Sequence, residues 1–223
     1  ISFTYIPHFP YGWSEGIWNL KKKEESLPHT EKLIYNPPKP FDPSAFIIGY
    51  CGSMGFINGL EDLLEKAEYA QRNRFQVEFW LAGEGSEKAN ILSRIKASGL
   101  TNVRVWDWLT TREVVDFLGR VEAAYISFLP VPVLSALSPN KYVEGLASSS
   151  LIITTLQGWM EKEILDYACG FFCPYGDPEI FFARLSPFLN DFAKLRHFQN
   201  NAYHLAVEKY HPEKRSEERR VGK

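Results

Sequence analysis

The sequence predicts an α/β fold in which helices cover both faces of a parallel sheet, an arrangement called doubly wound. From residue 41 onward, short apolar runs alternate with stretches in which apolar residues recur at helical spacing. Glycine, proline and polar residues separate the two kinds of segment. This alternation indicates βαβ units, whose right-handed crossovers place helices on both faces of one sheet.

Each predicted strand is a short apolar run bounded by turn residues, and each predicted helix has apolar residues three or four positions apart. The strands are expected at residues 46–50, 77–82, 103–106, 123–129, 151–154 and 170–173. The helices are expected around residues 60–67, 91–95, 114–118, 142–146, 164–167, 179–191 and 192–210. The last two helices follow one another directly and close the fold.

The chain divides into three parts by composition. Residues 1–40 are rich in aromatic residues and prolines without a sustained period, so we interpret them as an interdomain linker and the remnant of a missing N-terminal domain. Their aromatic side chains either cover the edge of the next domain or pack on the missing one. Residues 41–212 form the predicted domain, and residues 213–223 form a charged tail.

Bulk properties exclude several classes of protein. The formal net charge is −2 and the pI is about 6.3, so nothing indicates a partner that is a nucleic acid. Three cysteines are too few and too poorly spaced for a disulfide framework or a zinc site, and we expect buried, reduced thiols. We expect neither a leader peptide nor a membrane-spanning segment, since no apolar run reaches membrane-spanning length.

Ligands of doubly wound sheets bind at the carboxyl ends of the strands, so the residues that follow each strand are the candidates. Gly52, Ser53 and Gly55 follow the first strand and precede a helix. Glycines allow close approach to a ligand, and loop amides with a helix N-terminus favour a phosphate. The loop is neither a Walker motif nor a dinucleotide fingerprint. A tight strand-to-helix turn is the alternative interpretation.

Two further loops follow the second and third strands. Gly83, Glu84 and Gly85 form another close-approach turn, in which Glu84 either binds a hydroxyl group or faces water. Asp107, Trp108 and Leu109 could hold a base by its edge and face, whereas tryptophans in such loops also serve as packing.

The segment from Ser138 to Ala147 opens a helix after the fourth strand. Pro139 suits the start of a helix and Ser138 suits its cap. Lys141 then falls in the first turn, where the helix dipole disfavours a cation unless an anion lies beside it. Glu144, three residues later, shares a face with Lys141. The alternative is an ordinary surface pair, which explains Glu144 but not the placement of Lys141.

These loops, in this order and spacing, resemble the C-terminal domain of family 4 glycosyltransferases, which have the two-domain GT-B architecture with Rossmann-like halves. The resemblance covers roughly residues 46–210 and includes the run Ser138-Pro139-Asn140-Lys141. It implies that the 52–55 loop lies near a diphosphate, that Lys141 neutralises its developing charge, and that Glu144 accepts hydrogen bonds from ribose. Loop 107–109 would hold the base. The remaining residues expected to bind the donor are Gly83, Glu84, Gly85, Ser138 and Pro139.

Three positions depart from the family pattern. Ser53 and Asn58 stand where many members carry an arginine and a lysine. Ala136 stands where many members carry a first glutamate, eight residues before Glu144. Asp107 replaces a usual glycine.

The resemblance implies retaining transfer of a sugar from a nucleotide-diphosphate sugar to a glycan or lipid-linked acceptor, as in the synthesis of bacterial surface polysaccharides. The acceptor would bind through the missing domain, so we expect this fragment alone to be inactive. No Asp-x-Asp pair is present, and we expect no essential metal and no cofactor. The full protein would be cytoplasmic, either free or at the inner face of the membrane. The alternatives are a nucleotide-sugar epimerase of the same fold, a degenerate non-catalytic member and, third, a nicotinamide-binding domain.

Overall fold

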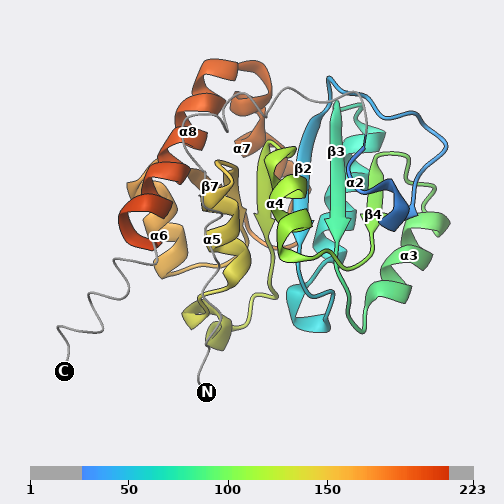
Figure 1. Cartoon of the computed structure of the whole chain (residues 1–223), viewed down its shortest axis with the longest axis horizontal. Helices are drawn as coiled ribbons and strands as arrows, with labels where there is room; N and C mark the ends of the chain where they lie inside the picture. The colour runs from blue at the N-terminus through green and yellow to red at the C-terminus, as the bar shows by residue number, and fades with distance from the viewer. Residues whose placement is uncertain (1–26, 211–223) are drawn as a thin grey trace.

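The computed structural model describes residues 27–210, which form a seven-stranded sheet between two layers of helices (Figure 1). In space the strands run in the order β1-β4-β3-β2-β5-β6-β7. Every pairing is parallel except that of β1 with β4. The strands are β1 (Leu33–Tyr35), β2 (Phe46–Cys51), β3 (Val77–Ala82), β4 (Val103–Trp106), β5 (Ala123–Ile126), β6 (Leu151–Thr154) and β7 (Gly170–Phe172).

The helices divide between the two faces of the sheet. One face packs against α2 (Glu61–Arg72), α3 (Lys88–Ala97) and α7 (Pro178–Asn190), and the other against α4 (Thr111–Gly119), α5 (Asn140–Ala147) and α6 (Trp159–Asp166). Helix α8 (Phe192–Leu205) contacts both α7 and α5. Short helical turns complete the chain: η1 (Thr30–Lys32), η2 (Phe56–Asn58), η3 (Pro132–Ala136) and η4 (Ala206–Tyr210).

The predicted doubly wound α/β fold is confirmed. Strand β3 is buried along its whole length and β2 along all but its last residue, because helices cover both faces of the sheet. From β2 the chain moves outward through β3 and β4 on one side and through β5, β6 and β7 on the other. The order therefore reverses between β2 and β5, where ligand crevices form in such sheets. The carboxyl ends of the parallel strands lie at the lower edge in Figure 1.

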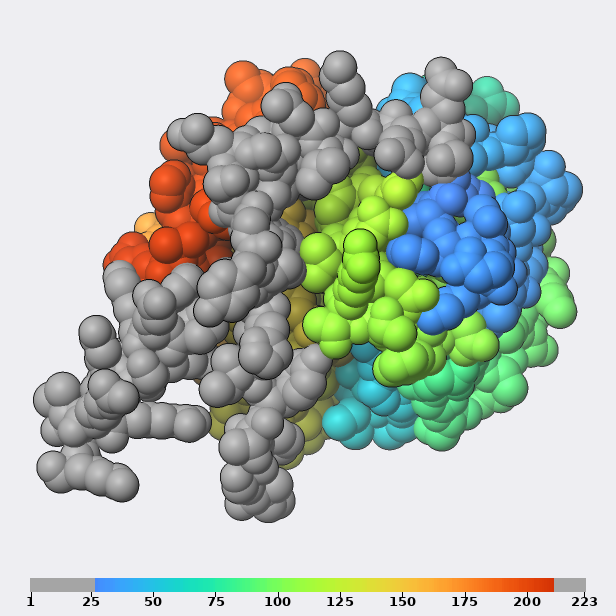
Figure 2. Space-filling model, in the orientation of Figure 1, coloured from blue at the N-terminus to red at the C-terminus, as the bar shows by residue number. Residues whose placement is uncertain are grey.

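The segment interpreted as a linker contributes a strand to the sheet, which corrects the prediction for its last residues. Strand β1 adds an antiparallel edge to β4, and the Trp106 indole donates a hydrogen bond of 2.8 Å to the Pro28 carbonyl. Lys32 forms an ion pair of 2.6 Å with Glu113 of α4. Figure 2 shows this N-terminal segment lying beside α4 on the surface. Its prolines and its lack of a period hid a strand of only three residues.

The strand predicted at residues 123–129 ends earlier, at Ile126. Side chains replace the strand ladder from there: the Ser127 hydroxyl donates 2.6 Å to the Asn58 carbonyl, and the Phe128 amide donates 2.9 Å to the Thr155 hydroxyl. The aromatic N-terminal stretch and the charged tail fall in residues 1–26 and 211–223, outside the described residues. Within residues 27–210, no helix combines the length and apolar character needed to cross a membrane.

Candidate functional site

A cavity of about 380 Å³ lies at the carboxyl ends of the strands, beside the point where the strand order reverses. It is bounded by the loops that follow β2, β3 and β4, by the start of α4 and by one residue of α5. Its lining residues are Cys51, Gly52, Ser53, Gly83, Glu84, Trp108, Leu109, Thr111, Val114 and Glu144. Seven of the residues predicted to bind a donor therefore meet at one cavity: Gly52, Ser53, Gly83, Glu84, Trp108, Leu109 and Glu144.

The two glycine loops are bonded to each other at the base of the cavity. The Gly52 amide donates 3.0 Å to the Ala82 carbonyl, and the Met54 amide donates 2.7 Å to the Glu84 carbonyl. A Cβ atom on Gly83 would lie 1.9 Å from the Gly52 carbonyl oxygen, and the φ of Gly83 is +144°. Glycine at this position is therefore required by the contact between the two loops, a role that the sequence did not reveal.

Replacing Gly83 with alanine is expected to lower the free energy of unfolding by about 2–4 kcal/mol, because the new Cβ forces the two loops apart and strains the backbone. Chemical denaturation measures this loss. Gly99→Ala is a matched control, since Gly99 also has a positive φ, +59°, but nothing lies within 4 Å of its Cβ position. The control should lose only about 1–2 kcal/mol. Equal losses for the two variants would contradict the steric explanation.

The amides of Ser53 and Gly55 donate no hydrogen bond to any group in the described part of the chain. Ser53 is exposed and lines the cavity, whereas Gly55 lies just beyond the lining at the N-terminal end of η2. Unpaired amides on a glycine-rich loop are suitable partners for an anion.

The two tryptophans at the end of β4 and in the loop after it differ in their exposure to solvent. Trp106 is buried, whereas Trp108 is 59% exposed and presents its ring at the cavity. The ammonium of Lys32, the last residue of η1, lies 5.6 Å from the centre of the Trp108 ring. Leu109 is buried beneath the same rim of the cavity. The exposed indole offers a surface on which a base could stack, which suits the interpretation of this loop as a base-binding loop.

Asp107 does not line the cavity, which differs from the prediction. Its carboxylate accepts hydrogen bonds from the Lys88 ammonium at 2.8 Å and from the Trp108 amide at 2.7 Å. Lys88 also pairs with Glu84, so one lysine ties the loops after β3 and β4 together. Although partial burial opposes it, hydrogen bonding to Asp107 and Glu84 raises the pKa of Lys88. Asp107 thus shapes the rim of the cavity through Lys88.

Helix α5 carries Lys141 in its first turn, as predicted, and the ammonium is surrounded by groups from other elements. It donates hydrogen bonds of 2.8 Å to the Asn58 Oδ1 atom, 3.2 Å to the Tyr50 hydroxyl and 3.3 Å to the Ser127 carbonyl. The rings of Tyr50 and Phe128 lie 4.6 and 4.1 Å from it. Lys141 does not line the cavity, and no ion pair joins its ammonium to Glu144 among the described residues.

Burial and neighbouring charges shift the pKa values of Lys141 and of two nearby residues, Cys51 and Glu144. Burial lowers the pKa of Lys141 to about 7, although Cys51 and Glu144 act in the opposite direction. Burial, strengthened by Glu144, raises the pKa of Cys51 to about 12. Burial also raises the pKa of Glu144, and Lys141 partly offsets this effect. Of Lys141 and Cys51, only Lys141 therefore changes charge near neutral pH.

Three further predicted residues do not line the cavity: Gly85, Ser138 and Pro139. Pro139 is itself the N-cap residue of α5, and no side chain caps the helix. The predicted cap by Ser138 is therefore wrong: Ser138 is exposed and precedes the cap, because Pro139 adopts the extended conformation of that position. A Cβ on Gly85 would clash with the Met54 backbone, so this glycine too serves the contact between loops.

The sequence did not identify three of the lining residues, namely Cys51, Thr111 and Val114. Thr111 and Val114 lie at the start of α4, which a capping box of Thr110 and Glu113 opens. The pattern Thr-x-x-Glu was a readable signal for this helix start. The thiols are free: Cys169 and Cys173 are buried as predicted, whereas Cys51 is half-buried at the cavity.

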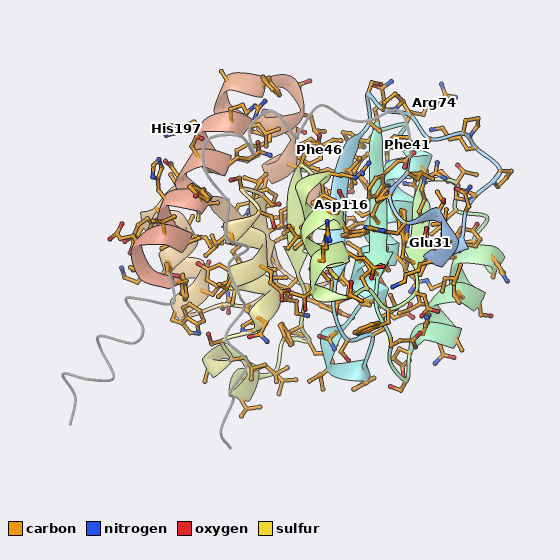
Figure 3. All side chains as sticks on the ribbon, viewed as in Figure 1. Glu31, Phe41, Phe46, Arg74, Asp116 and His197 are labelled. Carbon is orange, nitrogen blue, oxygen red and sulfur yellow. The ribbon has the colours of Figure 1, made fainter. Side chains whose placement is uncertain are left out.

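A second cluster of chemically capable groups lies between η1 and α4. Ligand atoms of His29, Glu31 and Glu113 lie within 4.8 Å of one another and could hold a metal ion. Lys32 already pairs with Glu113 at 2.6 Å, and none of the three residues lines the cavity. Figure 3 shows Glu31 on the N-terminal segment and His197 on helix α8, where His197 is exposed.

Comparison with known proteins places this geometry in a family. A family model described as "Glycosyl transferases group 1" matches residues 45–191 of the 223. No curated protein is similar enough in sequence to be matched.

Solved structures match over most of the chain. A variant of TarM from S. aureus, in complex with fondaparinux, α-GlcNAc-glycerol and UDP, has a TM-score of 0.64 and 22% identity, covering 81% of this chain and 36% of TarM. HepE from Anabaena, in complex with UDP, has a TM-score of 0.63 and 15% identity, covering 75% of this chain and 45% of HepE. The C-terminal domain of the group 1 family protein LpcC from Francisella tularensis has a TM-score of 0.59 and 15% identity, covering 83% and 98% of the two chains. The chain thus spans less than half of TarM and HepE.

Proposed function

Because this chain belongs to the glycosyl transferases group 1 family, we propose that its cavity binds the nucleoside diphosphate of a sugar donor. The observation that carries the proposal is the meeting of loop amides, an exposed indole and a carboxylate at one cavity on the carboxyl edge of the sheet. This is where doubly wound sheets bind their ligands. UDP is the first nucleotide to test, since TarM and HepE were both crystallised with UDP.

Each part of the cavity suits one part of the donor. The unpaired amides of Ser53 and Gly55 would donate to the diphosphate oxygens, and the Trp108 indole would stack on the base. The Glu144 carboxylate would accept hydrogen bonds from the ribose hydroxyls. Lys141, whose charge acts on the lining residues Cys51 and Glu144, would add positive potential where negative charge collects.

The proposed reaction is transfer of the sugar with retention at the anomeric carbon. The bond from that carbon to the diphosphate breaks and its electron pair leaves with the diphosphate, while a hydroxyl oxygen of the acceptor forms the new bond to that carbon and its proton passes to the departing diphosphate. Amides and a cation that are already oriented toward the leaving oxygens stabilise this charge without reorganisation. We propose that the transfer needs no divalent metal, because the loop amides and the positive potential of Lys141 stabilise the charge on the diphosphate.

The acceptor would bind mostly outside this chain. The chain spans 36% of TarM and 45% of HepE, and LpcC matches through a C-terminal domain alone. We therefore propose that an N-terminal domain completes the cleft and brings a glycan or lipid-linked acceptor of a surface polysaccharide. The full protein would act in the cytoplasm, free or at the inner face of the membrane. The present chain would bind the donor and transfer nothing.

Calorimetric titration with UDP, GDP and ADP, without metal, tests donor binding. Saturable binding of one nucleotide is expected, and Glu144→Ala should weaken it about tenfold to a hundredfold, because hydrogen bonds to a charged group contribute about 1.5–3 kcal/mol. Glu161→Ala is the matched control, since Glu161 lies on α6 and outside the cavity lining. This control should bind like the wild type.

Three outcomes would contradict the proposal. The first is the absence of saturable binding for all three nucleotides, which would favour a degenerate member. The second is an equal effect of the two glutamate substitutions. The third is conversion of the donor alone into a different sugar nucleotide, which would instead indicate an epimerase.

A further inference from the structure

The Tyr50 hydroxyl joins Lys141 to the glycine loop after β2. It accepts a hydrogen bond of 3.2 Å from the Lys141 ammonium and donates one of 2.5 Å to the Ser53 carbonyl. Tyr50 lies on β2 and is 0% exposed, so water does not compete for either bond. The three residues come from different elements. Tyr50 belongs to strand β2, Ser53 to the loop that follows it, and Lys141 to helix α5, 91 positions after Tyr50 in the chain.

The direction of these two bonds is set by chemistry. The Ser53 carbonyl can only accept a hydrogen bond, so the Tyr50 hydroxyl must donate to it. The Lys141 ammonium can only donate, so the same hydroxyl must accept from it. Burial, with a smaller effect of Cys51, raises the pKa of Tyr50 far above its ordinary value, so the hydroxyl keeps its proton. The chain of hydrogen bonds therefore cannot reverse.

The bond to Ser53 fixes the peptide that joins Ser53 to Met54. Its carbonyl is held by Tyr50, and its amide donates 2.7 Å to the Glu84 carbonyl on the opposite side. With this peptide held at both ends, the loop presents the unpaired amides of Ser53 and Gly55. These are the amides assigned above to the diphosphate.

We propose that Tyr50 is a positioning residue for the diphosphate, because its hydroxyl transmits the position of the Lys141 ammonium to the 52–55 loop. The inference rests on the proposed function and deepens it. Neither Tyr50 nor Asn58, which accepts a hydrogen bond of 2.8 Å from the same Lys141 ammonium, lines the cavity. Their effect is therefore confined to the part of the ligand that the loop and the lysine hold.

The test compares UDP with uridine, which has the same base and ribose but no phosphate, in amide-shift titrations of the intact protein. Tyr50→Phe keeps the ring and removes both hydrogen bonds. We expect it to weaken UDP binding about tenfold and to change uridine binding less than twofold. The matched control is Tyr35→Phe, which removes a comparable bond of 3.0 Å from a tyrosine hydroxyl to the Leu100 carbonyl, away from the cavity. It should change neither affinity.

A second variant keeps the test decisive if Tyr50→Phe folds poorly. Asn58→Ala leaves the tyrosine in place and removes another group that holds the ammonium, and it should also weaken UDP selectively. Equal losses for UDP and uridine, or unchanged UDP affinity in both variants, would overturn the role of Tyr50 while leaving donor binding intact. Failure of the wild-type protein to bind UDP would overturn the proposed function itself, and this inference with it.

Discussion

Replacing Lys141 with methionine is expected to weaken UDP binding about tenfold to a hundredfold at pH 6.5 and to have little effect at pH 8.5. Burial places the pKa of Lys141 at about 7, so the side chain is largely charged at the first pH and largely neutral at the second. At an effective dielectric constant of about 20, a cation about 6–10 Å from a phosphate contributes about 1.5–3 kcal/mol through space. UDP keeps its own charge across this range, because the last phosphate ionisation lies near pH 6.

The direction in which UDP affinity changes with pH follows from the coupling between ligand binding and proton binding. A diphosphate favours the charged ammonium, so its binding raises the pKa of Lys141 and takes up a proton above pH 7. Wild-type affinity should therefore fall as the pH rises through 7, by up to about tenfold per unit. The neighbouring Cys51 does not share this behaviour, because burial raises its pKa to about 12.

Calorimetry at a series of pH values measures this dependence. The matched control is Lys162→Met, which removes a lysine that is 76% exposed and paired with Asp166 on α6. It should keep both the affinity and the pH dependence of the wild type. A wild-type affinity that does not change between pH 6.5 and 8.5, or a Lys141→Met variant that keeps the slope, would contradict the assignment of charge to Lys141.

Lys141→Met should weaken UDP binding but stabilise the folded protein. The pKa of Lys141 is lower in the folded protein, about 7, than the ordinary value of 10.5. Between these two pH values the unfolded chain therefore binds more protons than the folded protein. Lys141 lowers the free energy of unfolding by its full amount below pH 7, and this destabilising effect disappears above pH 10.5. Lys141→Met should remove this contribution and raise the melting temperature at neutral pH.

Replacing Asp62 with alanine is expected to lower the free energy of unfolding by about 3–5 kcal/mol, the usual cost of breaking a buried ion pair. Asp62 and Lys66 are both 0% exposed on α2, and the ammonium lies 2.5 Å from the carboxylate. The same carboxylate accepts hydrogen bonds from the Tyr125 hydroxyl and, at 2.7 Å, from the Gly176 amide. The substitution leaves the buried Lys66 ammonium and the buried Tyr125 hydroxyl without this acceptor, and it removes the partner of the Gly176 amide.

The chain offers a matched control on another helix. Lys162 and Asp166 form an ion pair with the same i,i+4 spacing, but their side chains are 76% and 55% exposed. Asp166→Ala should therefore change the free energy of unfolding by no more than about 0.5 kcal/mol. Urea denaturation measures both values, and the double variant Asp62→Ala/Lys66→Met should recover part of the loss. Equal losses for Asp62→Ala and Asp166→Ala would show that the buried network does not stabilise the fold.

Local pattern was enough to predict most of the architecture. The parallel strands are buried on both faces, so each appears in the sequence as an apolar run, and the intervening helices carry an apolar stripe. Strand β1 was missed because it is an edge strand of three residues, Leu33–Tyr35, that pairs on one side only. The end of β5 was misplaced because bonds from Ser127 and Phe128 to other elements replace the ladder.

The position of the candidate site also followed from the sequence. Parallel strands place their carboxyl ends at one edge, so residues that follow β2, β3 and β4 had to converge. The glycine loops, Trp108 and Glu144 therefore meet at the predicted edge. Their order along the chain was sufficient for this conclusion, without knowledge of any side-chain contact.

Only the tertiary structure decided what surrounds each charge. Lys141 is held by Tyr50, Asn58 and Ser127, which lie 91, 83 and 14 residues away along the chain. Likewise, Gly83 is required because the Gly52 carbonyl lies against it, 31 positions earlier in the numbering. Periodicity depends on neighbours a few residues apart, so the sequence by itself determined the strands, the helices and the edge where the site forms. Burial, hydrogen-bond partners and pKa depend on residues that meet only when the chain folds, and these the tertiary structure alone determined.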